Sequence, residues 1–357
     1  MVQLILCVVA FVLSCILAMI LYRPSKEPAF QNMSTRGGIA VILSTVLCVA
    51  AFLFLTLSSA EHILFPVLLW ALGLSLYGLV SHRLNRFWTY LLVCLLSAFS
   101  IPSSWIFFQG ALPWGVDRAV IAVLWAATLH ISATLNGLPV LMPTFIRLHL
   151  ITLLLLNLWT PNLPLIWVLL ICLCAQLGFS LYAYKKPFLR QGKSGIVPAM
   201  YLIGFFWLQT IESAPIGRGG LWLSCGVAYS YLIWEILYSC AYRWIFRKKK
   251  EPKMLSFFFV QSLQKNLNKS SAVERFFSYR WSLLMLFAVV LGILNTSAAS
   301  LVWPTAFVLF VVIVEMFTQI TAFDGKVTAT TSMFSIYPMC KDIFAGCKEG
   351  LRSLRKK

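Results

Sequence analysis

Acidic residues are scarce in this sequence, and charged residues of either sign are few. Only 11 of its 357 residues are Asp or Glu, and the four charged types together make up 11% of the chain, whereas hydrophobic residues make up 60%. With a mean hydropathy of +0.86, the chain is too apolar for a soluble domain. The composition therefore excludes a soluble globular protein and predicts a polytopic membrane protein.

The apolar residues form continuous runs, and about eleven of these reach the roughly 20 residues that a membrane-spanning helix needs. Because the runs do not alternate with polar residues, strands are not expected. The predicted fold is all-α, with a transmembrane bundle and five cytoplasmic loops in residues 1–322 and a basic amphipathic cytoplasmic tail in residues 323–357. The predicted spans are 2–22, 38–60, 62–80, 87–108, 117–135, 140–159, 163–184, 196–212, 220–245, 281–298 and 301–322.

Basic residues outnumber acidic ones and give a formal net charge of +18, and their distribution has a topological explanation. All of the 29 Lys and Arg residues except Arg118 and Arg218 fall in alternate loops or in the tail. The positive-inside rule assigns those loops to the cytoplasm. We therefore predict an amino terminus outside, a cytoplasmic carboxyl terminus and no nucleic-acid partner.

Cysteines and two acids fall inside the predicted spans. Eight of the ten cysteines lie there and two lie in the tail, so the simplest interpretation is that they are small apolar packing residues rather than a disulfide framework. The two acids are Glu235 and Glu315. An ionisable group within a span faces the bundle interior or a polar cavity, and both a hydrogen-bonded structural role and a proton path stay open for these two.

Four short segments on the predicted cytoplasmic side combine glycine with polar or basic residues, and we expect them to converge. Each has a simple interpretation when taken alone, such as an interfacial loop or a Gly-Pro turn. A glycine pair nevertheless permits close backbone approach, and a helix that starts there presents free N–H groups to a phosphate. The segments contain Arg36-Gly37-Gly38, then Gly78 followed by Ser81-His82-Arg83, then Asn136-Gly137 followed by Pro139, and last a basic turn, Gly192-Lys193-Ser194-Gly195, after Lys185, Lys186 and Arg190.

In their order and glycine positions, these segments resemble the cytoplasmic loops of the polyprenyl-phosphate N-acetylhexosamine-1-phosphate transferases. The resemblance covers about residues 1–322. It implies a multi-pass protein of the bacterial cytoplasmic (inner) membrane. The family's reaction transfers a sugar-1-phosphate from a UDP-sugar to a polyprenyl phosphate, and it uses Mg²⁺ because both reactants are anionic.

The sequence departs from the family at the acids that serve this chemistry. The second, third and fourth of these loops contain no Asp or Glu, and residues 243–280 lack the histidines that the family's fifth loop carries. Since Mg²⁺ prefers carboxylate and water ligands, we expect no catalytic residues and no metal site. The family's acidic or otherwise catalytic positions correspond here to Ser81, His82, Asn136, Pro139 and Lys193.

The predicted function is that of a non-catalytic relative of these transferases. It would bind a lipid phosphate such as polyprenyl phosphate, or serve other membrane proteins as a partner in envelope polysaccharide or glycolipid assembly. Cationic side chains and helix starts would hold the phosphate where the family uses a metal ion. The candidate phosphate-binding residues are Arg36, Gly37, Gly38, Arg83, Lys185, Lys186, Arg190 and Lys193.

Other interpretations of the same residues stay open. The basic loops can simply follow membrane topology around a site that has lost its function. An active, divergent transferase that still uses Mg²⁺ is the first functional alternative, and an unrelated carrier or flippase is the second. The sequence does not distinguish a monomer from a homodimer.

Overall fold

The computed structural model describes most of the first 230 residues and a short segment near residue 290. The described residues are all helices and connecting turns, and no strand occurs among them. They cover residues 2–21, 37–56, 63–80, 86–108, 111–134, 141–159, 162–185, 191–214, 220–230, 281–282 and 284–293.

Eight helices form the bundle, and each coincides with one of the first eight predicted spans. Residues 220–230 and 284–293 add two further helical stretches. The bounds are α1 Val2–Leu21, α2 Gly37–Thr56, α3 Leu64–Val80, α4 Arg86–Ser100, α5 Trp114–Thr134, α6 Leu141–Trp159, α7 Leu163–Lys185 and α8 Gly192–Ser213.

Six of these helices are long and apolar enough to cross a membrane, so the chain is a helical, multi-pass membrane protein. They are α1, α2, α5, α6, α7 and α8, while α3, α4 and residues 284–293 are shorter apolar helices. The predicted total of about eleven spans and the predicted tail extend into residues outside those that the structure describes.

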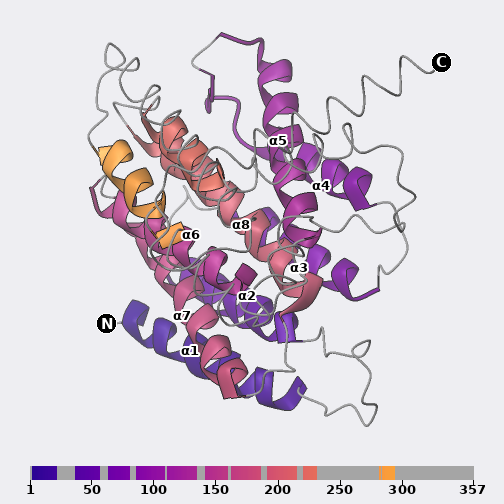
Figure 1. The fold of residues 1–357 in the computed structure, drawn as a ribbon, viewed down its shortest axis with the longest axis vertical. Coiled ribbons are helices and arrows are strands. Elements are labelled where there is room, and N and C mark those ends of the chain that lie inside the picture. The colour runs from indigo at the N-terminus through magenta and orange to yellow at the C-terminus, as the bar shows by residue number, and fades with distance from the viewer. Residues whose placement is uncertain are drawn as a thin grey trace, which may run out of the picture.

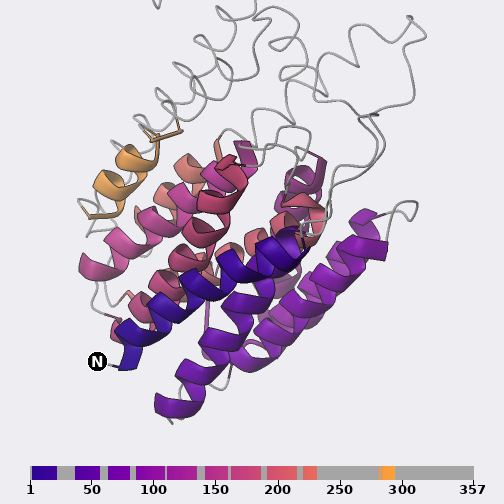
Figure 2. The same cartoon turned by 90° about the horizontal axis from the view of Figure 1, so that it is seen from below.

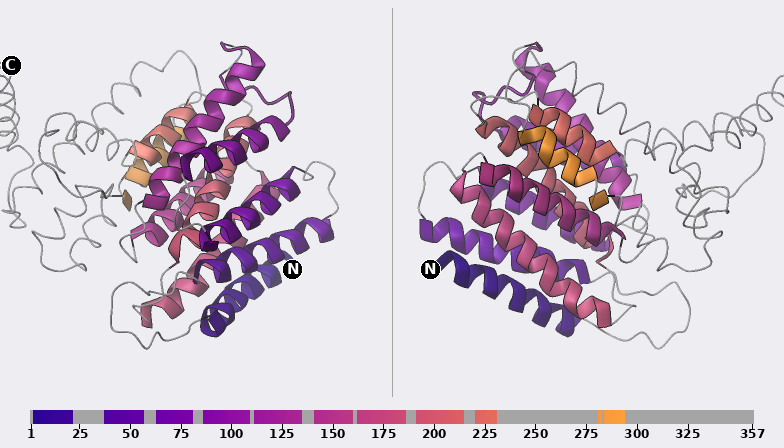
Figure 3. Two further views of the ribbon diagram at one scale, coloured as in Figure 1. Left: turned by 90° about the vertical axis from the view of Figure 1, so that its right-hand side faces the viewer. Right: turned by 60° about the vertical axis from the view of Figure 1, so that its left-hand side comes forward.

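Helix α8 is the centre of the bundle, and α1 lies at its edge. In Figure 1, α8 passes between α6 on one side and α3, α4 and α5 on the other. It packs against α2, α3, α5 and α6, and 89% of its membrane-spanning window is buried, compared with 17% for α1. Helix α1 lies at the edge of the bundle, where it packs on α7 and α2 (Figure 3). It leaves a face of large apolar side chains exposed, as expected for a helix that contacts lipid.

The helices run roughly alongside one another, so the bundle has two opposite ends (Figure 2). At one end, the starts of α2 and α8 meet the end of α3. We call this the Lys193 end, and it carries the predicted cytoplasmic loops that follow α1, α3 and α7. At the other end, residues 101–108 pack against the start of α5, and we call this the Arg118 end.

Two predicted boundaries are wrong. The span predicted over 87–108 ends as a helix at Ser100, because residues 101–108 leave the helix axis and supply carbonyl oxygens to Arg118. The span predicted over 196–212 begins four residues earlier, at Gly192. The residues 192–195, which the sequence suggested as a basic turn, therefore form the first turn of α8.

Candidate functional site

The first turn of α8 is the part of the Lys193 end where the described members of the predicted site meet. Gly192 begins the helix with a φ of 63°, a left-handed conformation that favours glycine. Lys193 follows and is half-buried, whereas Ser194 and Gly195 are buried. The amino end of a helix carries a partial positive charge, so Lys193 adds a full positive charge of the same sign.

Helix α2 touches this turn backbone to backbone. A Cβ atom added to Gly38 would lie 2.1 Å from the carbonyl oxygen of Gln191 and 2.2 Å from the amide nitrogen of Gly195. A Cβ atom on Gly195 would in turn lie 2.5 Å from the Cα atom of Gly38. Only glycine fits at either position, and these two helix starts contact each other instead of facing an open space.

Helix α3 covers a second side of the same turn. A Cβ atom on Gly78 would lie 2.8 Å from both the nitrogen and the Cα atom of Ser194. The backbone N–H groups of Ser194 and Gly195 therefore lie close to the backbones of α3 and α2. Helices α2 and α3 therefore enclose the first turn of α8 from two sides.

A proline inside α8 explains the polar contact that fixes α3 at this place. Pro198 has no backbone N–H, so it cannot donate to the carbonyl oxygen of Ser194, four residues earlier. The hydroxyl of Ser75 donates to that oxygen instead, at 2.7 Å, and the bond is buried. The serine of α3 thus replaces the helix bond that the proline removes.

A buried pair of amides ties α7 to the start of α8. The Nε2 atom of Gln191 donates to the Oε1 atom of Gln176 at 2.9 Å, and both side chains are almost fully buried. The Oε1 atom of Gln191 is buried without a hydrogen-bond partner among the described residues. Because this atom can only accept a hydrogen bond, it does not favour a phosphate, which is also an acceptor.

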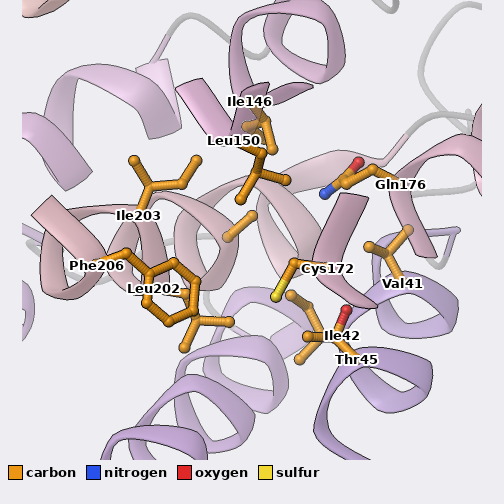
Figure 4. Close-up of a pocket in the computed structure, with 11 residues that line it drawn as sticks. Val41, Ile42, Thr45, Ile146, Leu150, Cys172, Gln176, Leu202, Ile203 and Phe206 are labelled. Carbon is orange, nitrogen blue, oxygen red and sulfur yellow. The ribbon is translucent and has the colours of Figure 1, made fainter. Parts of the chain in front are cut away.

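Gln176 also lines a small cavity in the middle of the bundle. Figure 4 shows its side chain together with Cys172 and Thr45 on one side and Leu202, Ile203 and Phe206 on the other. The cavity has a volume of about 20 Å³, roughly enough for one water molecule. A sugar nucleotide does not fit in it.

The structure brings together only part of the predicted site. Gly38 and Lys193 lie at one junction, and Gly37 is buried at the start of α2. Lys185 ends α7, and its backbone alone is described. The remaining predicted site residues lie outside the described residues: Arg36, Ser81, His82, Arg83, Asn136, Pro139, Lys186, Arg190, Glu235 and Glu315.

The described residues do not fit the Mg²⁺ ion that the family resemblance implies. Within the described ranges, no three His, Cys, Asp or Glu side chains lie close enough together to hold a metal ion. The two carboxylates in those ranges, Asp117 and Glu212, belong to the start of α5 and the end of α8. Glu212 is 19 residues from Lys193, about 28 Å along the helix axis, and an ammonium at the position of the motif's acid repels a divalent cation.

The Arg118 end holds a buried charge whose burial the sequence did not predict. Arg118 is fully buried, and its Nη2 atom donates to the carbonyl oxygens of Pro102 and Trp105, each at 2.7 Å. Its guanidinium carbon lies 4.9 Å from the ring centre of Phe107. The carboxylates of Asp117 and Glu212 lie near enough to stabilise the positive charge of the guanidinium.

Asp117 and Trp222 both bond to the backbone of the segment 101–108, which also contacts Arg118. The Oδ1 atom of Asp117 accepts a hydrogen bond from the backbone N–H of Phe108 at 3.0 Å, and the indole N–H of Trp222 donates to the carbonyl of Phe107 at 2.9 Å. The only sequence signal for this arrangement was an Asp-Arg pair between a proline and an apolar run. Because Arg118, Asp117 and Trp222 all bond to backbone atoms of residues 102–108, this end of the bundle has a structural role.

Comparison with known proteins adds no relative. No protein-family model matches the chain, and no curated protein matches it. The resemblance to the transferase family therefore stays a prediction from the loop motifs.

Proposed function

We propose that this chain is a non-catalytic relative of the polyprenyl-phosphate sugar-1-phosphate transferases that binds a lipid phosphate without a metal ion. The observation that supports the proposal most strongly is the packing of Gly38 and Gly78 around the first turn of α8. These contacts gather three of the four predicted loop segments around Lys193.

Electrostatics favours an anion at this position. A lysine in the first turn of a helix is unfavourable because its charge adds to the positive end of the helix dipole. An anion held there would be stabilised by the ammonium and by the positive end of the helix dipole. The fixed backbone contacts keep the turn in place before the ligand arrives, which reduces the entropy lost on binding.

The chemistry favours a phosphate of a lipid over a sugar nucleotide. The cavity beside Gln176 takes roughly one water, so this cavity cannot hold a nucleotide and a sugar. A lipid carries its phosphate at the membrane surface, where the start of a spanning helix lies. In this proposal the protein resides in a bacterial cytoplasmic membrane, its Lys193 end faces the cytoplasm, and it serves envelope polysaccharide or glycolipid assembly.

The test is binding of undecaprenyl phosphate to the purified full-length protein in EDTA. Lys193→Ala should weaken binding by roughly 10- to 100-fold, the effect of removing one charged hydrogen-bonding group, and Lys193→Glu should abolish it. Arg147→Ala is the matched control, because Arg147 is also a cation of this half of the bundle but bonds to Pro143 and Thr144 of its own helix. Equal binding by wild type and Lys193→Glu would contradict the proposal.

The active-transferase alternative makes a different prediction for the same protein. Membranes that contain only this chain would release UMP from a UDP-N-acetylhexosamine in the presence of Mg²⁺ and a polyprenyl phosphate. We expect no UMP release. Release that depends on the chain would replace the binding proposal with catalysis.

A further inference from the structure

A pair of cysteine thiols joins the outermost helix to the rest of the bundle. Cys7 of α1 and Cys174 of α7 lie close enough for their thiols to interact, although 167 positions separate them in the sequence. Cys7 is buried, and Cys174 is partly buried. Both thiols are free in the structure.

The two helices are in close contact one turn further along. A Cβ atom added to Gly178 would lie 2.2 Å from the carbonyl oxygen of Phe11, so the two backbones touch at that point. Phe11 follows Cys7 by four residues, and Gly178 follows Cys174 by four residues. The equal offsets show that α1 and α7 run in parallel and in register, and Figures 1 and 3 show them side by side.

This geometry meets the main requirement for a disulfide bond. Two cysteines can be bridged without backbone movement only when their Cα atoms lie within about 7 Å and their side chains point toward each other. Glycine at position 178 allows the short separation between the helices, and Cys7 and Cys174 each lie one turn before that contact, where their thiols interact.

Neighbouring cysteines are less suited to the same reaction. Cys172 is two residues from Cys174, so it points to a different side of α7, where it lines the cavity with Thr45 and Gln176. Cys15 is two helical turns beyond Cys7 on α1. Cys174 is therefore better placed than Cys172 to react with Cys7, and better placed to react with Cys7 than with Cys15.

From these contacts we infer that Cys7 and Cys174 are a disulfide-forming site that locks α1 onto α7. Dioxygen is the oxidant, because it is apolar and dissolves in the bilayer that surrounds α1. Each thiol gives up one hydrogen, an S–S bond forms, and dioxygen takes the two electrons and two protons to become hydrogen peroxide. Since α1 lies at the edge of the bundle and packs mainly on α7 and α2, the bond would fix an edge helix to its main neighbour.

The experiment uses the full-length protein in lipid, with an amino-terminal tag and a protease site inserted between α1 and α2. The tagged fragment then contains Cys7 and Cys15 as its only cysteines. After treatment with copper–phenanthroline in air, alkylation and cleavage, the tag should migrate with the remainder of the chain on a non-reducing gel. Dithiothreitol, or incubation under nitrogen without the copper reagent, should give the free α1 fragment.

Substitutions then identify the partners. Cys7→Ser and Cys174→Ser should each abolish the joined species, whereas Cys15→Ser and Cys172→Ser should retain it. If a serine variant fails to fold, mass spectrometry of the oxidised wild type decides instead, because the peptides that carry Cys7 and Cys174 should be found linked with the loss of two hydrogens. A free α1 fragment after oxidation of the wild type, or joining that survives Cys7→Ser, would overturn the inference.

Discussion

The two ends of the bundle handle positive charge in opposite ways. At the Arg118 end, the cation is fully buried, two carbonyl oxygens accept its hydrogen bonds, and the carboxylates of Asp117 and Glu212 lie near it. At the Lys193 end, a half-buried lysine stands in the first turn of a helix, and both carboxylates of the described residues belong to the opposite end.

This contrast indicates that Arg118 serves the stability of the protein, whereas Lys193 is suited to bind a ligand. Arg118 donates hydrogen bonds to carbonyls of the protein itself, so its removal should harm folding more than binding. Lys193 is added to the positive end of a helix dipole, an arrangement that disfavours the protein alone and favours a bound anion. If Lys193 stands where the resemblance places an acidic residue of the family, binding of an anion is the physical reason for a lysine there.

The largest expected effect on stability comes from Arg118→Met. The substitution leaves the carbonyls of Pro102 and Trp105 without their donor, and each buried acceptor left unsatisfied costs roughly 1–3 kcal/mol. Arg147→Met is the matched control, with an expected cost below about 1 kcal/mol because its bonds are local to α6. Thermal unfolding of the purified proteins in lipid or detergent measures both, and equal melting temperatures would contradict the assignment of Arg118 as structural.

Gly38→Ala tests the backbone contact at the Lys193 end. The added methyl group would overlap the carbonyl of Gln191 and the amide of Gly195, both backbone atoms that cannot rotate away, so we expect a cost of roughly 2–3 kcal/mol. Gly73→Ala in α3 is the control, because nothing lies within 4 Å of its added Cβ. Stability of Gly38→Ala at the level of Gly73→Ala would mean that α2 and α8 do not touch there.

Ser75→Ala should have a smaller effect, about 1–3 kcal/mol, because it leaves the buried carbonyl of Ser194 without a donor. The double variant with Pro198→Ala should recover stability, since alanine restores the N–H that the proline lacks. Ser100→Ala, which removes a bond within α4, serves as the control and should cost less. If Ser75→Ala lowers the free energy of unfolding by the same amount with proline as with alanine at position 198, Ser75 does not compensate for the missing N–H of Pro198.

Much of the bundle was predictable because membrane-spanning helices follow from the length of apolar runs. The glycines of three loop segments were also identified before their contacts were known. The contact of Gly38 with Gly195 could not be predicted from the sequence, because the residues around Gly38 do not indicate which helix packs against α2. The bond from Ser75 to Ser194 was hidden for the same reason, although Pro198 alone indicates that a carbonyl four residues earlier needs a donor.

The Arg118 end was missed for a different reason. An Asp-Arg pair at the predicted outer boundary of a span is typical of a solvated loop, and the sequence contains no signal that residues 101–108 fold over it. The same fold-back shortens α4 relative to its apolar run. Local composition predicted the span, and a contact between distant residues determined its end.

The most direct test of the central claim is the affinity of the purified protein for undecaprenyl phosphate, measured once in EDTA and once in excess Mg²⁺. If Lys193 supplies the positive charge, the affinity will be the same in both buffers and will be lost in Lys193→Glu. Binding that appears only with Mg²⁺, or that Lys193→Glu leaves intact, would contradict the account.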